Sequence, residues 1–142
     1  MENNINILDE LNKGCCMGID ALNYIIDEVK EKDFKQLLEN QLAEYNSFSG
    51  RICDLYKEYS KDEINKTNNL EKMMTWYGVK KDTMMDDGIS NISDMLIRGT
   101  TMGIIEGRKI LNSKTMNKEV HDICSDYVKM QEKYVEKLKD CL

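Results

Sequence analysis

The residues with the clearest chemical potential are six polar side chains that fall on the apolar stripes of predicted helices. Five of them are tyrosines or glutamines, which could join in a hydrogen-bonded layer, and one is a carboxylate. A carboxylate among apolar side chains is costly unless it is paired, protonated, hydrogen-bonded or bound to a metal. Two interpretations stay open: a polar layer that fixes the register of the helices, or an altered metal site. The six residues are Gln41, Tyr45, Glu106, Tyr127, Gln131 and Tyr134.

A second signal is a glycine motif that occurs twice in otherwise helical sequence. A basic residue is followed by glycine, two small residues, methionine, glycine and isoleucine, beginning at Lys13 and again 85 residues later at Arg98. Glycine inside a helix costs about 1 kcal/mol relative to alanine, and small residues four apart let two helices approach closely. We expect the two motif-bearing helices to cross antiparallel with their glycines facing each other; room for a ligand or a partner helix is the alternative. The helix-packing residues are Gly14, Gly18, Gly99, Gly103 and Gly107.

Long helices are needed to position these residues, and the hydrophobic pattern predicts four of them. Apolar residues recur every three or four positions through four stretches, so each helix carries one stripe that must be buried. Short connections make the first and second helices, and the third and fourth, antiparallel pairs. We predict one all-α domain over 1–142, a four-helix bundle of two antiparallel hairpins joined by a long crossover that holds a short helix. The helices are expected at about 5–30, 33–59, 88–112 and 117–141, with the crossover at about 60–87.

The two predicted hairpins are also alike in sequence. Moving the second helix onto the fourth by 86 residues superposes Phe34 on Val120 and Phe48 on Tyr134. Two amphipathic helices match in phase partly by necessity, but amphipathicity does not require the shared glycine motif. The pattern therefore indicates an internal duplication of a helical hairpin.

Composition limits the classes of function. The chain has no proline, 41% hydrophobic residues, 32% charged residues and a net charge of -6, which is typical of an all-helical protein and argues against a nucleic-acid partner. No apolar run predicts a membrane span and no leader sequence is visible, so we expect a cytoplasmic protein. The five cysteines lack C-x-x-C spacing and are expected to be reduced. The adjacent Cys15 and Cys16 are a redox candidate, although neighbours on a helix point about 100° apart.

The segment between the two hairpins carries the only tryptophan and a cluster of methionines. Methionine-rich apolar surfaces adapt to varied partners, so we expect this segment to form an interface in a homodimer or with another protein. The alternative is that the same residues cover the bundle's own core. The residues concerned are Met73, Met74, Trp76, Met84 and Met85.

The order of helix pair, long crossover and helix pair, with the stretch 99–106 and its counterpart 14–20, resembles the ferritin-like superfamily. Over residues 5–142 the chain is similar to the small bacterial four-helix proteins of unassigned function in that superfamily. The resemblance implies a ferritin-like bundle. Its di-iron members take one Glu from each of the first and third helices, and a Glu-x-x-His motif from each of the second and fourth.

By that resemblance, the candidate metal ligands are Asp20, Glu44 and Glu106, and the metal would be iron, manganese or zinc. The di-iron motif is incomplete, because the residue three after Glu44 is Ser47 and the residue three before the single histidine, His121, is Lys118. We therefore expect no bound cofactor and no ferritin-type oxidase activity.

The sequence offers no pairing of a nucleophile with a base, and no glycine-rich phosphate loop follows a strand. We therefore expect a non-enzymatic protein that acts through protein–protein contacts. The alternative function is that of a ferritin-like protein that binds a metal or a small ligand at a degenerate di-metal site.

Overall fold

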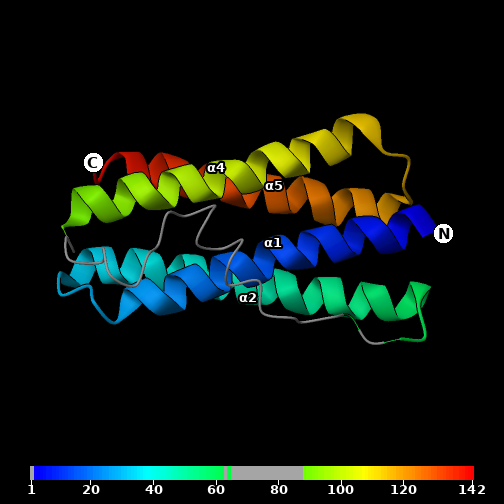
Figure 1. Cartoon of the computed structure of the whole chain (residues 1–142), viewed down its shortest axis with the longest axis horizontal. Helices are drawn as coiled ribbons and strands as arrows, with labels where there is room; N and C mark the ends of the chain where they lie inside the picture. The colour runs from blue at the N-terminus through cyan, green and yellow to red at the C-terminus, as the bar shows by residue number, and fades with distance from the viewer. Residues whose placement is uncertain (1, 63, 65–87) are drawn as a thin grey trace.

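Four long α-helices lie side by side along one axis in the computed structural model of this protein (Figure 1). The structure describes residues 2–62, 64 and 88–142, and these residues contain no strand. The prediction of an all-α four-helix bundle is confirmed at this level. The expected crossover helix and the predicted interface residues between 73 and 85 lie outside the described residues. The helices are α1 (Glu2–Ile26), α2 (Lys32–Tyr59), α4 (Ile89–Ser113) and α5 (Lys118–Lys139).

The helices form two antiparallel hairpins. α1 packs chiefly along α2, and α4 packs chiefly along α5. The connecting segments 27–31 and 114–117 are short, which makes each pair of helices neighbours. α2 and α4 run in the same direction along the bundle (Figure 1). None of the described helices combines the length and the apolarity needed to span a bilayer.

The first helix departs most from its predicted bounds, because α1 begins at residue 2 and ends at Ile26 rather than at residue 30. The backbone N–H of Val29 donates to the carbonyl of Ile26 at 3.1 Å, which closes a tight turn and buries the Val29 side chain. Glu31 then caps α2, since its carboxylate accepts a hydrogen bond from the backbone N–H of Phe34 at 2.7 Å.

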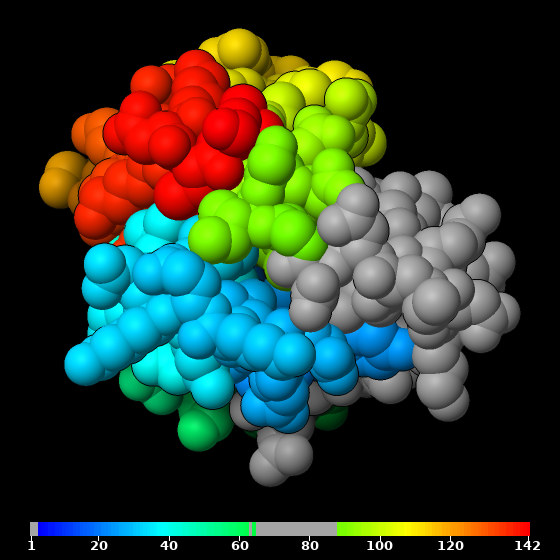
Figure 2. All heavy atoms as spheres, turned by 90° about the vertical axis from the view of Figure 1, so that its left-hand side faces the viewer, coloured from blue at the N-terminus to red at the C-terminus, as the bar shows by residue number. Residues whose placement is uncertain are grey.

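The core runs along the bundle axis and receives side chains from all four described helices. Its largest fully buried apolar residues are leucines and isoleucines, whose removal from water is the main stabilising contribution. Gln41, Tyr45 and Gln131 are buried equally deeply among them. Figure 2 shows one end of the bundle, where the α1–α2 connection, the start of α4 and the C-terminus come together. The apolar residues are Leu8, Leu22, Ile25, Leu38, Ile52, Leu96 and Leu138.

Candidate functional site

A buried polar layer crosses the middle of the bundle. Tyr45 Oη on α2 donates to Gln131 Oε1 on α5 at 3.3 Å, and the rings of Tyr45 and Tyr127 meet edge to face with centroids 6.1 Å apart. Gln41 Nε2 donates to Thr100 Oγ1 on α4 at 3.5 Å. These contacts tie the first hairpin to the second, so the layer fixes how the two hairpins align.

Glu106 is the one sequence-predicted member of the layer that the structure places outside it. Its side chain is exposed, whereas the other five residues are buried. The buried face of α4 passes from Gly103 to Gly107, four residues on, and therefore misses Glu106. Tyr134 lies at the edge of the layer and donates a hydrogen bond to the Glu44 carboxylate.

Tyr127 also hydrogen-bonds the thiol of Cys15, which is fully buried on α1. Burial raises the pKa of the Cys15 thiol far above its usual range. A thiol that stays protonated is a poor nucleophile. Cys15 therefore does not offer a reactive thiolate to the redox pair considered for Cys15 and Cys16.

The glycines of α1 make room for tyrosine side chains from the neighbouring helices. A Cβ at Gly18 would lie 2.8 Å from Cζ of Tyr45, and a Cβ at Gly14 would lie 2.9 Å from the hydroxyl oxygen of Tyr127. Real Cβ atoms do not approach other atoms this closely, so a side chain at either position would force a buried tyrosine to shift. The requirement for glycine is stronger at Gly18, where the Cβ would meet the ring of Tyr45, than at Gly14, where it would meet the hydroxyl end of Tyr127.

The glycines of α4 make room for α5 in the same way. A Cβ at Gly103 would overlap Oε1 of Gln131, and a Cβ at Gly107 would overlap Cγ2 of Val128. The gaps are therefore filled by side chains of α2 and α5. The expectation that the glycines bring α1 and α4 into direct contact is corrected: the two motifs face each other across a cavity.

The contacts follow the sequence offsets of the two hairpins. Gly18 accommodates Tyr45, and the matching Gly103, 85 residues later, accommodates Gln131, which is 86 residues after Tyr45. The hydrogen bond between Tyr45 and Gln131 thus joins two equivalent positions of the hairpins. Tyr45 and Gln131 differ in residue type, but each packs against the corresponding glycine of its own hairpin.

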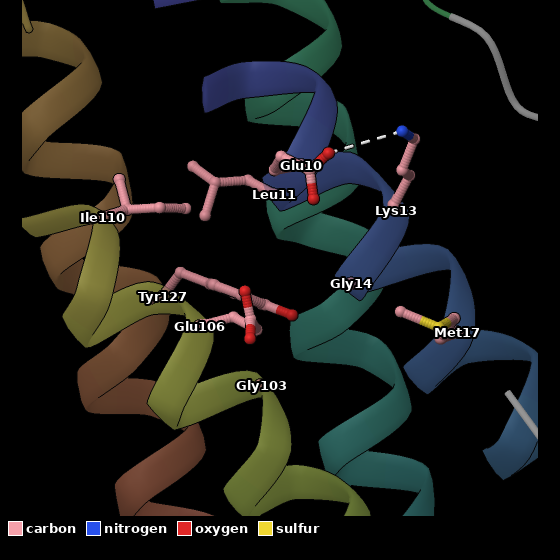
Figure 3. A pocket seen from close by; sticks show the side chains of 10 residues that line it. Glu10, Leu11, Lys13, Gly14, Met17, Gly103, Glu106, Ile110 and Tyr127 are labelled. Atoms are coloured by element: carbon pink, nitrogen blue, oxygen red, sulfur yellow. Dashed lines mark hydrogen bonds and ion pairs between the residues drawn. The ribbon is translucent and has the colours of Figure 1, made fainter. Parts of the chain in front are cut away.

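The cavity lies between α1, α4 and α5 and has a volume of about 250 Å³ (Figure 3). Its apolar lining comes from Leu11, Met17 and Ile110. Tyr127, which is 2% exposed, lines the cavity and reaches from α5 toward Gly14 on α1, where its hydroxyl is buried. The cavity therefore combines apolar side chains, bare glycine backbone and one buried tyrosine.

Three charged residues line the same cavity. Lys13 Nζ lies 3.4 Å from Glu10 Oε1, and both side chains are about half exposed (Figure 3). Glu106 lines the cavity from α4 and forms no ion pair within the described residues. An exposed ion pair contributes little to stability, but it does neutralise its own charges locally. Among the described residues that line the cavity, the Glu106 carboxylate is therefore left without a paired cation.

The candidate metal ligands do not converge on one place. Glu44 is bound to Lys133, whose Nζ lies 2.9 Å from Oε2. Partial burial opposes ionisation of Glu44, but hydrogen bonds from Tyr134 and Lys133 outweigh it and lower the pKa of the carboxyl. Burial raises the pKa of Asp20. Within the described residues, no three His, Cys, Asp or Glu side chains gather as a metal site would require.

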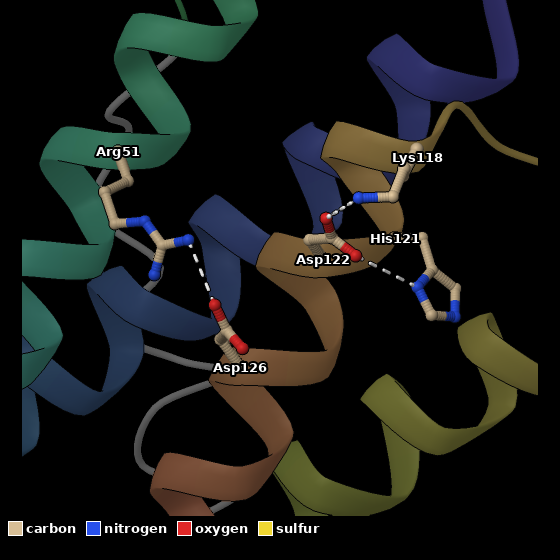
Figure 4. Close-up of polar contacts among 5 residues, drawn as sticks. All are labelled: Arg51, Lys118, His121, Asp122 and Asp126. Carbon is tan, nitrogen blue, oxygen red and sulfur yellow. Dashed lines mark hydrogen bonds and ion pairs between the residues drawn. The ribbon is translucent and has the colours of Figure 1, made fainter.

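The single histidine lies on the surface of α5 (Figure 4). His121 Nδ1 is 3.6 Å from Oδ1 of Asp122, whose other oxygen is 3.3 Å from Lys118 Nζ. The hydrogen bond from Lys118 is the main cause of the lowered pKa of Asp122. Arg51 and Asp126, 3.2 Å apart, link α2 to α5 nearby. None of these residues lines the cavity.

Comparisons with protein-family models, with curated proteins and with solved structures find no match to this chain.

Sequence reasoning missed the residues that make the cavity a site. Glu10 and Ile110 belong to no motif, and their only signal is their place within about one turn of a helix-packing glycine. Met17 is the methionine of the glycine motif, but the motif gave no sign that this side chain lines a cavity. Asn4 was missed as well; its Oδ1 accepts the backbone N–H of Asn117 at 2.8 Å and ties the start of α1 to the α4–α5 connection.

The glycine packing gives a prediction about stability. Gly18→Ala should lower the free energy of unfolding by about 1–3 kcal/mol, because its methyl group meets the buried ring of Tyr45. Gly50→Ala is the matched control inside α2, where no atom lies within 4 Å of the added Cβ, and it should raise stability by about 0.5–1 kcal/mol. Urea denaturation of both variants is the measurement. Equal effects would contradict the assigned contact.

Cys124 gives a prediction about pH. Its thiol donates to the Gly107 carbonyl at 3.7 Å, and burial raises its pKa from 9.0 to about 11. The unfolded thiol ionises first as pH rises, so the stabilisation is complete below pH 9 and is lost as pH rises through about 11. Between about pH 8 and about pH 10.5, the wild type should lose about 2 kcal/mol more stability than Cys124→Ala. Urea denaturation at both pH values tests this, and equal losses in the two proteins would contradict it.

Proposed function

We propose that this protein is a non-enzymatic binding protein that takes a small organic molecule into the cavity between α1, α4 and α5. The supporting observation is the cavity itself, with about 250 Å³ of space beside the buried hydroxyl of Tyr127. An apolar cavity of about 150 Å³ holds benzene, which has six non-hydrogen atoms. At the same volume per atom, this cavity has room for roughly ten non-hydrogen atoms. Spaces between the helices of bundles are common ligand sites.

The chemistry of the lining supports binding in preference to catalysis. Among the described residues that line the cavity, the titratable groups are Glu10, Lys13, Glu106 and Tyr127, and there is no serine, cysteine or histidine. A nucleophile beside a base is the usual signature of covalent catalysis. The scattered positions of Asp20, Glu44 and Glu106 likewise favour an organic ligand over a metal ion.

A substitution that fills the cavity tests this proposal. Ile110→Trp puts a large side chain into the lining, and Ile105→Trp is the matched control on the same helix, since Ile105 is 42% exposed and does not line the cavity. The probes are n-hexylamine, n-hexanol and hexanoate, which fit the available volume. Saturation-transfer NMR should detect binding of at least one probe to the wild type and to Ile105→Trp, and no binding to Ile110→Trp.

Absence of binding by all three probes would overturn the proposal. So would binding that survives Ile110→Trp, because the probe would then occupy some other place. The melting temperature of each variant, measured alongside, verifies that a loss of binding does not come from unfolding.

We also propose that the chain is a member of the ferritin-like superfamily and that it arose by duplication of a helical hairpin. Two antiparallel hairpins with α2 and α4 running in the same direction support the first. The second is supported by the bond between Tyr45 and Gln131, which joins residues 86 positions apart, the offset that superposes the hairpin sequences.

A second candidate function is contact with another protein or a second copy of this chain. Met102 and Ile105, which are 40% and 42% exposed, lie about one turn apart on α4 and favour this candidate. If they form an interface, the double variant Met102→Ser, Ile105→Ser should sediment more slowly than the wild type while melting at a similar temperature. Identical sedimentation of the two proteins would exclude this surface as a self-association interface.

A further inference from the structure

We infer that the ligand of the cavity is a small organic cation, an ammonium group carried on a short apolar body. The inference rests on the proposed binding function and names the chemical class of its ligand. The charges, the buried hydroxyl and the apolar lining each contribute one part of the argument.

The charge of the lining selects a cation. Lys13 and Glu10 neutralise each other at 3.4 Å, which leaves the carboxylate of Glu106 without a cation among the described residues. Two basic residues follow Glu106 on α4. Arg108 is held by Glu132 on α5 at 3.0 Å, and Lys109 does not line the cavity and forms no ion pair with Glu106 within the described residues. An ammonium group would supply the missing positive charge, whereas a carboxylate or phosphate would meet the like charge of Glu106. The net charge of -6 on the whole chain also favours the approach of cations.

The hydroxyl of Tyr127 gives the cation a second contact. It is the buried end of a side chain that lines the cavity and is 2% exposed, and a hydroxyl oxygen carries two lone pairs. An ammonium group has three donors, so it can bond Glu106 and Tyr127 together and keep one donor for water. A neutral alcohol of the same length can donate fewer hydrogen bonds. None of its bonds is strengthened by a positive charge on the ligand.

The remaining lining sets the body of the ligand. Leu11, Met17 and Ile110 offer apolar contacts, and the thioether of Met17 adapts to the shape of a flexible chain. The backbone of Gly14 lets the ligand lie close to α1. Space for roughly ten non-hydrogen atoms admits an alkyl or small aryl amine and excludes nucleotides and folded peptides.

Calorimetric titration of the full chain with n-hexylamine, n-hexanol and hexanoate tests the inference. The amine should bind at least about fivefold more tightly than the alcohol, and hexanoate should bind most weakly. Glu106→Gln should reduce the affinity for the amine to that for the alcohol and leave the alcohol unaffected. Glu136→Gln is the control, an exposed carboxylate on α5 that pairs with Lys139 and does not line the cavity, and it should change neither affinity.

The outcomes separate this inference from the function on which it rests. If n-hexanol or hexanoate binds as tightly as n-hexylamine, or if Glu106→Gln leaves the affinity for the amine unchanged, the cationic ligand is wrong and the binding function stands. If none of the three probes binds the wild type, both are overturned. Added sodium chloride should weaken binding of the amine and leave binding of the alcohol unchanged, which a purely apolar contact would not produce.

Discussion

The hydrogen bond between Tyr45 and Gln131 exists because Gly18 and Gly103 have no side chains to fill the space that it needs. Each partner lies against the bare backbone of the opposite helix in its own hairpin. Because both are buried at the centre of the bundle, the bond sets the alignment of the two hairpins, and a shift of either would leave buried polar atoms without this partner. The other contacts of the layer follow from this alignment.

The same constraint accounts for the cavity. Tyr127 fills the space beside Gly14 on α1, and the cavity lies between that glycine and Gly103 and Gly107 on α4. These glycines contribute no atoms beyond the backbone, which leaves room between the two helices. The hydroxyl occurs in one hairpin only, since the position that matches Tyr127 in the first hairpin is Gln41. Within the described residues, the matching glycine contacts of the two hairpins therefore do not extend to this hydroxyl.

Periodicity predicted the helices and most of the polar layer, because a helix with one apolar stripe has one way to bury it. Gln41 and Tyr45 were predicted inside for that reason. Glu106 was wrongly predicted to be buried because glycine has no apolar side chain that would identify the buried face of the helix. That face continues from Gly103 to Gly107, four residues on, and leaves Glu106 exposed. Paired glycines indicate a close approach, but they do not distinguish a neighbouring backbone from a tyrosine ring. The cavity depends on that distinction and could not be predicted.

The glycines also bear on the order in which the helices form. α4 carries three glycines in its middle and α5 carries none. The helical state of an isolated α4 is therefore less stable, by about 3 kcal/mol, than it would be with alanine at these three positions. Such a segment becomes helical when its gaps are filled, and Gln131 and Val128 of α5 fill two of them. We therefore expect α5 to form early in folding and to act as the surface on which α4 winds. Among the described helices, the one with the most glycines therefore depends on its neighbour α5 to become helical.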